Sequence, residues 1–546
     1  MKLFSKSQRS LNAVFFVGAC ALMVACGGGN DASVAPAATV TPPVITTPVV
    51  APPASATATL RGTVSDAASG AGVAGVVVSV GGLNTTTSAV GAYTLSVTTG
   101  TLVVSFRKAG FVEQTKISTD LNNAGDTAFL NVPFLAFAQS TVLTGTSAQT
   151  VTVAGSTAAV ALPADGLRRA DGSAAQGAIT VNLTPINPAL NVSTMPGSLV
   201  TSVNGVTSPI ESFGALNVTI VDAAGAILNL RSGQSATIRI PAVTRGAALP
   251  LNIPLFYFNS ITGQWIQEGT ATLVGTGSGA FFQGTVTQFS TWNADQVVNT
   301  AFVSGCVNDS ASVRVAGARV TTEGINYIGT NSVRTDAQGN FRIAVKTNSR
   351  AALTASASSG LAGSSVSVNS TTGEQTIATC LTLVQASGNV GGITIKLAWG
   401  EQPSDLDSHL WAPTATGSTT EIDYSNKGAL GTSPFINLDV DDTDSFGPEF
   451  VTINKIARST VYRYWVNNYS NSFTPGQIGS PARVEVNVGG NLTTFSPPAG
   501  EASNSNWHAF DIVVDASCNV TVVPVNTWLS AAPTAPVYGS ARNYCN

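Results

Sequence analysis

The chain has 546 residues, of which 44% are hydrophobic and only 10% are charged, and its net charge is -4. This length predicts several domains, and the hydrophobic fraction excludes a disordered chain. The negative charge argues against a nucleic-acid-binding protein, for which a basic surface is typical. The 53 glycines and the many short runs of Val, Thr, Ser and Ala predict short strands joined by tight turns, so we expect an all-β fold.

The N-terminus has the pattern of an export signal. Three basic residues among the first nine precede an apolar stretch over 11–25, which is shorter than the ~20 apolar residues of a spanning helix. The letters LMVA directly before Cys26 resemble the lipobox of bacterial lipoproteins. This resemblance implies that residues 1–25 are removed, that a lipid is attached to the Cys26 thiol and, because Gly27 follows, that the protein is exported to the outer membrane. A plain secretory signal with an incidental cysteine is the alternative.

Behind the signal peptide we expect a linker and four β modules. Residues 26–56 are rich in Pro, Ala and Thr, so they predict an extended stalk that lifts the modules off the membrane. The modules are expected over 57–136, 137–298, 299–386 and 387–546. We expect each of them to be a β-sandwich, so the predicted fold is a series of tandem β-sandwich modules on an N-terminal, lipid-anchored stalk.

Two of these modules share an internal repeat. The stretch TTSAVGAYTLSV (86–97) aligns with RTDAQGNFRIAV (334–345). The alignment pairs Thr87 with Thr335, Gly91 with Gly339 and Tyr93 with Phe341. The glycine permits a turn, and the aromatic residue returns to the core on the next strand. The pattern resembles the carboxypeptidase regulatory-like domain, a transthyretin-like β-sandwich, which implies an accessory module without catalytic machinery.

Cysteine usage also indicates an exported protein. Four of the six cysteines lie outside the signal region, at Cys306, Cys380, Cys518 and Cys545, and they allow three pairings. Because Cys306 and Cys380 lie in the first and last strands expected for one module, we predict the disulfides Cys306–Cys380 and Cys518–Cys545 in an oxidising compartment. Four free buried thiols are the alternative. A zinc site is disfavoured, since the chain has no CxxC and only two histidines.

The last module holds the acidic excess. From residue 390 to the C-terminus there are 14 Asp and Glu against 7 Lys and Arg. The period of a strand places Asp405, Asp407 and His409 of SDLDSHL on one face, and the acidic stretch LDVDDTDSFGPE (438–449) follows. The series resembles the YfaP-like family of exported bacterial β-domains. That resemblance implies a fold and a compartment rather than an activity.

The carboxylates of this module predict a calcium site. A Ca²⁺ ion takes about six to eight oxygen ligands, several of them carboxylates. Clustered carboxylates repel one another unless a cation compensates them. The ligands that we expect are Asp405, Asp407, Asp439, Asp441, Asp442 and Glu449. A solvated acidic turn, whose aspartates accept backbone N–H bonds, is the alternative.

We expect binding or structural display rather than catalysis. A retaining glycosidase needs two carboxylates ~5–5.5 Å apart, and we expect Asp405 and Asp407 to stand at about that distance. A hydrolase triad would need a nucleophile in a strained elbow, and the chain has no G-x-S-x-G. The alternative function is that of a carbohydrate-binding accessory protein of a surface enzyme complex, with Trp411 and Trp465 as stacking platforms. The expected partners are the membrane, through the lipid, and a surface polysaccharide or another envelope protein.

Overall fold

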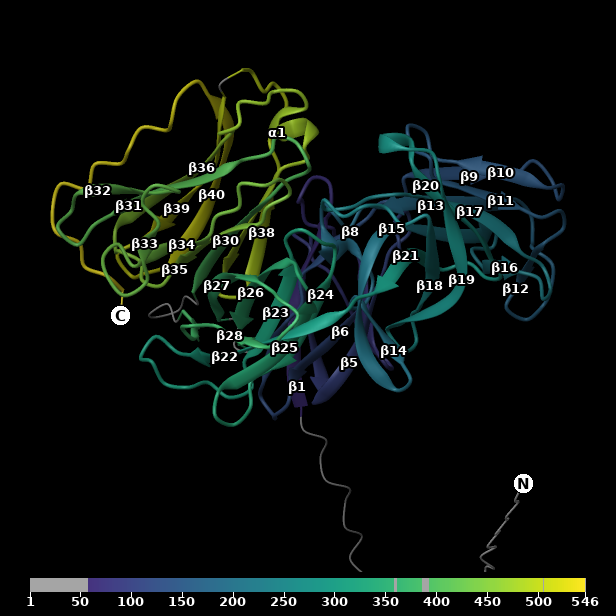
Figure 1. Ribbon diagram of the computed structural model, residues 1–546, viewed down its shortest axis with the longest axis horizontal. Helices are drawn as coiled ribbons and strands as arrows, with labels where there is room; N and C mark the ends of the chain where they lie inside the picture. The colour runs from purple at the N-terminus through teal and green to yellow at the C-terminus, as the bar shows by residue number, and fades with distance from the viewer. Residues whose placement is uncertain (1–56, 358–360, 385–391, 504, 546) are drawn as a thin grey trace, which may run out of the picture. The chain divides into compact units, whose positions relative to one another are not determined.

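The computed structural model describes residues 57–357, 361–384, 392–503 and 505–545. The expected signal peptide, Cys26 and the expected stalk lie outside these ranges. Within them the protein is all-β and consists of tandem β-sandwich modules, as the sequence predicts (Figure 1). The described ranges contain no helix with the length and apolar character needed to cross a lipid bilayer.

The first module packs two four-stranded sheets face to face. Its strands are β1 (Thr57–Asp66), β2 (Val77–Val80), β3 (Leu83–Thr86), β4 (Ala92–Thr98), β5 (Gly100–Arg107), β6 (Gln114–Leu121), β7 (Thr127–Phe129) and β8 (Val132–Phe134). One sheet has the order β4-β1-β7, with β8 also paired to β1, and the other has the order β3-β2-β5-β6. Every second side chain points between the sheets, so Leu60, Val78, Val104 and Phe106 meet in one core.

The second module is a connected system of 13 strands. The elements are β9 (Gln139–Val142), β10 (Gln149–Thr152), β11 (Ala159–Leu162), β12 (Leu167–Arg169), β13 (Ile179–Ile186), η1 (Val192–Thr194), β14 (Val200–Val203), β15 (Val206–Asp222), β16 (Ile227–Leu230), β17 (Ala236–Pro241), β18 (Asn252–Asn259), β19 (Gln264–Val274), η2 (Gly277–Gly279), β20 (Phe281–Val286) and β21 (Thr291–Val297). Leu183 and Trp292 lie in its core. Strand β15 shifts register between Ser212 and Ala215. Gly214 makes this bulge possible, because its φ is +120° and a Cβ there would lie 2.3 Å from a carbonyl oxygen of β17.

The third module repeats the strand order of the first. Its strands are β22 (Thr300–Asn308), β23 (Arg319–Gly324), β24 (Thr330–Arg334), β25 (Asn340–Lys346), β26 (Arg350–Ser356), β27 (Ala362–Asn369), β28 (Gln375–Thr376) and β29 (Leu381–Thr382). The sheets have the orders β25-β22-β28, with β29 paired to β22, and β24-β23-β26-β27. Each strand therefore takes the place of its counterpart from β1 to β8. Cys306 of β22 is bonded to Cys380, just before β29, with an S–S distance of 2.06 Å.

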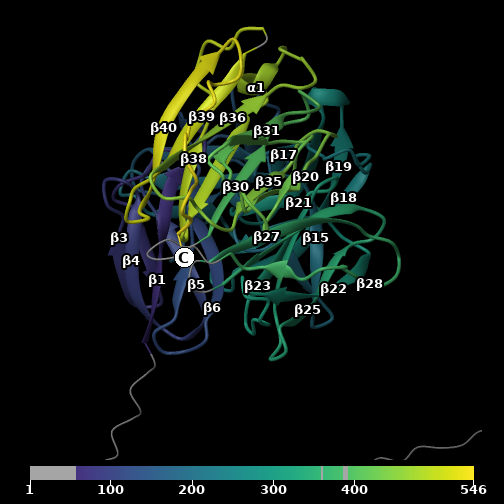
Figure 2. The same ribbon diagram turned by 90° about the vertical axis from the view of Figure 1, so that its left-hand side faces the viewer.

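The fourth module is a sandwich of a six-stranded and a five-stranded sheet. Its elements are β30 (Ile393–Ala398), β31 (Asp407–Pro413), β32 (Thr419–Ile422), β33 (Gly428–Ala429), β34 (Ile436–Val440), β35 (Glu449–Ile453), β36 (Thr460–Asn467), α1 (Gly476–Gly479), β37 (Arg483–Val488), β38 (Asn491–Phe495), β39 (Asn506–Val514) and β40 (Val520–Leu529). The sheet orders are β33-β34-β35-β30-β37-β38 and β32-β31-β36-β39-β40. Figure 2 shows β36, β39 and β40 side by side in the second sheet. Trp399, Tyr464, Trp507 and Phe510 fill the core between the sheets.

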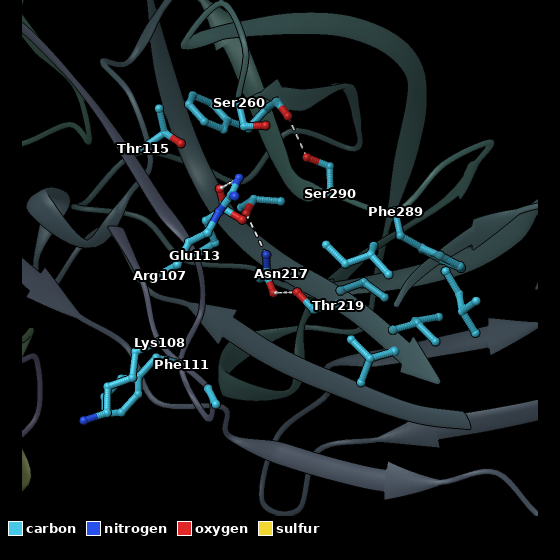
Figure 3. Close-up of a pocket in the computed structure, with 18 of the residues that line it drawn as sticks. Arg107, Lys108, Phe111, Glu113, Thr115, Asn217, Thr219, Ser260, Phe289 and Ser290 are labelled. Carbon is cyan, nitrogen blue, oxygen red and sulfur yellow. Dashed lines mark hydrogen bonds and ion pairs between the residues drawn. The ribbon is translucent and has the colours of Figure 1, made fainter. Parts of the chain in front are cut away.

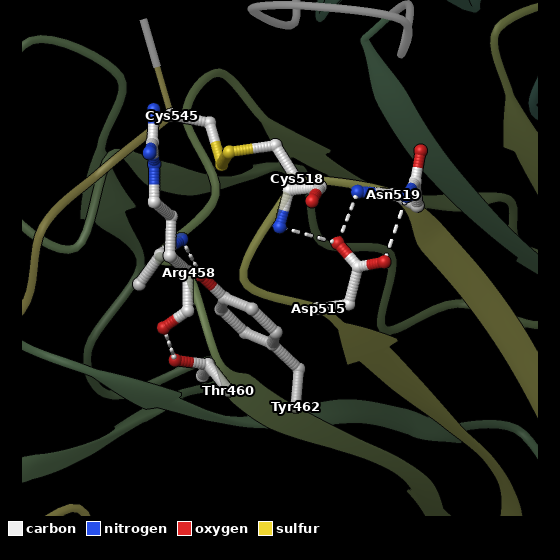
Figure 4. Close-up of a disulfide and its surroundings, with 9 residues drawn as sticks. Arg458, Thr460, Tyr462, Asp515, Cys518, Asn519 and Cys545 are labelled. Carbon is white, nitrogen blue, oxygen red and sulfur yellow. Dashed lines mark hydrogen bonds between the residues drawn. A yellow bond between two sulfur atoms is a disulfide. The ribbon is translucent and has the colours of Figure 1, made fainter.

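The segment after β40 folds back along the five-stranded sheet. The indole N–H of Trp411 donates to the carbonyl oxygen of Pro533 at 3.0 Å, and the hydroxyl of Tyr538 donates to a carbonyl oxygen of β36 at 2.8 Å. A disulfide between Cys518 and Cys545, with an S–S distance of 2.02 Å, ties the end of this segment to the turn before β40 (Figure 4). Both disulfides of the described chain thus have the pairing that the sequence predicts.

Candidate cation site in the C-terminal module

Three carboxylates from separate segments converge at one end of the fourth module. Asp407 begins β31 of one sheet, Glu449 begins β35 of the other, and Asp441 follows the last residue of β34. One oxygen atom from each lies within 4.8 Å of the others. Two ligands of a single Ca²⁺, each at ~2.3–2.6 Å, stand at most ~5 Å apart. The spacing therefore fits oxygen atoms that share one ion.

Glu449 and Asp407 are buried with unsatisfied oxygen atoms. Glu449 has no exposed surface; its Oε2 accepts the backbone N–H of Ser408 at 2.7 Å, whereas its Oε1 has no hydrogen-bond partner. Asp407 is only 3% exposed, and its Oδ2 also has no partner. A buried charged group without a partner costs several kcal/mol, so such carboxyls either keep a proton or bind a cation.

Burial and mutual repulsion favour the neutral forms of these carboxyls. Burial, assisted by the charge of Asp405, raises the pKa of Asp407 to about 7. Burial, assisted by the charge of Asp441, raises the pKa of Asp405 to about 6. The complete burial of Glu449 raises its pKa well above the usual range. A bound cation would oppose all three shifts, because it stabilises the ionised carboxylate.

The donor set consists of oxygen atoms and has an excess of negative charge. Asp405 adds a fourth carboxyl group, whose Oδ1 is buried and unpartnered. The ammonium group of Lys427 lies 2.8 Å from Asp441 Oδ2, while Asp441 Oδ1 remains without a partner. Among the described residues, Lys427 is the one cation that forms an ion pair with any of these four carboxyls. Such an all-oxygen, anionic environment fits a hard divalent cation, and Ca²⁺ tolerates its irregular geometry better than Mg²⁺ does.

Two of the expected ligands are directed elsewhere. Asp439 accepts hydrogen bonds from the hydroxyl of Thr452 and from a backbone N–H of β27, because its neighbours in β34 point into the core and Asp439 points away. Asp442 pairs with the guanidinium group of Arg350. The candidate set is therefore narrower than the sequence predicts, and it consists of Asp405, Asp407, Asp441 and Glu449.

Of the two tryptophans that we expected as stacking platforms, Trp465 is buried and Trp411 is half-buried. Trp465 is 1% exposed; the ring of His409 stacks on it at 5.0 Å, and Trp411 packs against it at 5.4 Å. Trp411 itself is half-buried and donates to Pro533 of the C-terminal segment. Neither indole belongs to the core cluster between the two sheets. Trp411 is held by the C-terminal segment, and the return of that segment along the sheet has no signal in the sequence.

The exposed aromatic side chains beside the carboxylates are tyrosines, which the sequence reasoning missed. Tyr424 is 45% exposed and Tyr469 is 54% exposed. Their rings meet edge to face, with centroids 5.5 Å apart and planes at 67°. The available signal was their position in the polar, turn-forming runs EIDYSN and NNYSNS, where an aromatic side chain has no core to enter.

A cavity of about 520 Å³ lies elsewhere, between strands of the first and second modules (Figure 3). Arg107 Nη2 lies 2.7 Å from Glu113 Oε1, and the hydroxyl of Ser290 donates to the carbonyl oxygen of Phe258 at 2.6 Å. The described residues that line this cavity include no histidine or cysteine. These polar groups on its wall are thus already engaged within the protein, and much of the rest of the wall is apolar.

Comparison with known proteins identifies one module type. Residues 59–134 match the family model of the carboxypeptidase regulatory-like domain, and this range spans nearly all of β1 to β8. No curated protein sequence matched the chain. Among solved structures, the chain is similar to a protein of unknown function (17% identity, TM-score 0.21, 27% of this chain and 94% of that chain), to a DUF3823 family protein from Parabacteroides merdae (14%, 0.14, 37% and 97%) and to BcpA, the major pilin subunit of Bacillus cereus (9%, 0.14, 59% and 98%).

Proposed function

We propose that the chain is a non-catalytic protein of the bacterial cell envelope, anchored in the outer membrane by a lipid on Cys26, and that Ca²⁺ stabilises its C-terminal module. The lipobox pattern supports the anchor. The regulatory-like module supports a role in binding or display, because domains of that type accompany active domains rather than supply catalysis. The resemblance of the last module to exported YfaP-like domains points to the same compartment.

The calcium proposal rests mainly on the burial of Glu449 with an unpartnered oxygen atom. Its carboxyl group is completely buried, its Oε1 has no hydrogen-bond partner, and that side chain lies in one group with Asp407 and Asp441. A solvated acidic turn, the alternative from the sequence, would leave its carboxylates in water or bonded to backbone N–H groups. Glu449 has only one such bond, from Ser408, and no exposure to water.

Calorimetry of the full chain with added calcium tests the proposal. Binding to the folded state alone stabilises it by RT ln(1 + [L]/Kd), which is ~2.7 kcal/mol at a hundredfold excess over Kd. Extracellular calcium modules often have Kd values of ~10⁻⁴–10⁻³ M, so the titration extends to tens of millimolar. Mg²⁺ at equal ionic strength is the control for simple screening of charge. We expect one unfolding transition to move to higher temperature with Ca²⁺ beyond that control.

Matched variants test whether the calcium-induced shift of the unfolding transition arises at this site. Asp407→Asn and Glu449→Gln keep the shape of a protonated carboxyl group, so both variants should fold and lose the calcium-specific shift. Asp444→Asn removes the same charge from a nearby side chain that is 71% exposed, and it should retain the shift. An equal response to Ca²⁺ and Mg²⁺, or a calcium shift that survives in Glu449→Gln, would contradict the proposal.

The second candidate function is carbohydrate binding. The exposed pair Tyr424 and Tyr469 favours it, since aromatic faces next to polar groups suit sugar rings. Trp465 does not favour it, because its indole is covered.

A further inference from the structure

We propose that the cation site and the two exposed tyrosines form a single binding site for a polyhydroxylated carbohydrate. In this site the bound Ca²⁺ would ligate sugar hydroxyl groups, and the rings of Tyr424 and Tyr469 would contact the apolar face of the sugar. The inference rests on the proposed calcium site and names the ligand of that site.

Both tyrosines are held next to the carboxylates by different parts of the chain. The backbone N–H that follows Tyr469 donates to the carbonyl oxygen of Asp405 at 3.4 Å, so the loop with Tyr469 runs beside the site. His409 lies two residues after Asp407 on β31, and its ring meets that of Tyr424 edge to face at 6.5 Å. The aromatic pair and the carboxylates therefore border one region of the surface.

The aromatic side chains beside the site are held in place by contacts within the protein, without a ligand. His409 stacks on the buried ring of Trp465 at 5.0 Å, and its Nδ1 lies 2.7 Å from a carboxylate oxygen of Glu421. The imidazole is thus held on its face and at its edge, and it supports the ring of Tyr424, which in turn contacts Tyr469. A binding surface that is already ordered loses little conformational entropy when a ligand binds.

The chemistry of the cation site and of the tyrosine pair favours a neutral polyol as the ligand. A Ca²⁺ ion takes about six to eight oxygen ligands, and Asp407, Asp441 and Glu449 leave coordination positions for water or sugar hydroxyls. A purely apolar ligand would desolvate the carboxylates of Glu421 and Asp423 without replacing their hydrogen bonds. A sugar ring combines hydroxyl groups, which can ligate the ion, with an apolar face, which can contact the tyrosine rings.

A cationic peptide is the rival ligand, because carboxylates and aromatic rings also bind ammonium groups. It would need no calcium and would compete with it for the carboxylates. The complete burial of Glu449 favours a small ion over an ammonium group on a long side chain. The site therefore favours a carbohydrate, and binding of a cationic probe is an outcome that would contradict this ligand.

The test is binding of the full chain to an array of neutral and uronic-acid oligosaccharides, with calcium or with EDTA. We expect retention of at least one oligosaccharide in calcium and loss of that binding in EDTA. By titration calorimetry with the retained oligosaccharide, Tyr424→Ala and Tyr469→Ala should each weaken binding by about tenfold, the scale of a lost aromatic contact. Both variants should keep the calcium shift of the unfolding transition. Val537→Ala, which changes another side chain of the same module that is 93% exposed, is the control and should change neither quantity.

The possible failures can be told apart. If the chain binds calcium but retains no oligosaccharide, this inference is wrong and the calcium site stands. If calcium produces no specific shift, both proposals fail. Oligosaccharide binding that persists in EDTA or in the tyrosine variants would also overturn the inference, as would retention of a poly-lysine probe that calcium displaces.

Discussion

Thr87 and Thr335 make the same two hydrogen bonds at the same point of the two repeated modules. The hydroxyl of each accepts the backbone N–H of the residue just before β2 or β23, at 2.9 Å in both modules. Each hydroxyl also donates to a backbone carbonyl oxygen of the preceding turn, at 2.6 Å for Thr87 and 2.7 Å for Thr335. Both side chains are buried, with 6% exposure. The threonine thus fixes the entry of the chain into the second strand of each module.

Replacing this threonine by valine should destabilise its module. Thr87→Val keeps the side-chain shape but leaves a buried N–H and a carbonyl oxygen without their partner, at a cost of ~1–3 kcal/mol. Calorimetry of the full chain should show one unfolding transition at lower temperature. Thr86→Val, at the exposed neighbouring position, is the control and should have little effect. Equal effects of the two substitutions would show that the hydroxyl of Thr87 does not have this role.

The repeat could be predicted from the sequence because its signals are local. Gly91 and Gly339 have φ values of +76° and +74°, so the same turn needs glycine in both modules. The neighbouring positions Tyr93 and Phe341 are both 4% exposed, as expected for an aromatic residue that returns to the core. A turn, a buried threonine and a buried aromatic residue all lie within a few positions of one another, so they can be recognised without knowledge of the tertiary fold.

The cation site could be predicted only in part, because its composition depends on contacts between distant segments. The strand period predicts that Asp405 and Asp407 lie on one face, and their charges do interact, although β31 begins only at Asp407. It does not show that Glu449 is buried beside Ser408 or that Asp439 bonds to other partners, since both facts depend on how the two sheets pack. The covering of Trp411 likewise depends on the path of a segment 122 residues further along the chain.

Acylation of Cys26 is a prediction about the mature N-terminus. Mass spectrometry of membrane-extracted protein should show a lipidated N-terminal peptide that begins at Cys26, and Cys26→Ser should release the protein into the soluble fraction. A single acyl chain binds a bilayer only marginally, so several chains are expected on this residue. Cys20→Ser is the control and should leave the lipid in place. A soluble product that begins elsewhere and is unchanged by Cys26→Ser would refute the anchor.

The Cys518–Cys545 disulfide should hold the C-terminal segment on its sheet. The two cysteines are 27 residues apart, and a loop of this size contributes ~3–4 kcal/mol in the chain-entropy model. The double variant Cys518→Ser/Cys545→Ser should unfold at lower temperature and be cleaved faster by protease within residues 530–545. Cys306→Ser/Cys380→Ser is the matched control, because it removes a disulfide from another module. If both double variants expose the C-terminal segment equally, the segment is not held by its own disulfide.

The calcium effect should depend on pH. Burial, with the charge of Asp405 as a further cause, raises the pKa of Asp407 from 3.8 to about 7. Between these values the folded state binds more protons than the unfolded state, so without metal the stability contributed by Asp407 falls as the pH rises from ~4 to 7. Calcium requires the ionised carboxylate and must displace this proton at low pH. The calcium affinity should therefore increase as the pH rises.

Calorimetry at pH 5, 6, 7 and 8, with EDTA and with calcium, measures this dependence. The difference in Tm between the two conditions should be small at pH 5 and grow toward pH 8, because protons compete with calcium for Asp407, Asp405 and Glu449. The Tm in EDTA includes the titration of every other group in the chain. Asp407→Asn provides the correction, since its Tm in EDTA should fall less between pH 5 and pH 7 than that of the unmodified chain. A calcium-induced shift of the same size at pH 5 and pH 8 would mean that the ion binds outside these buried carboxyls, for example at exposed carboxylates that are ionised throughout this range.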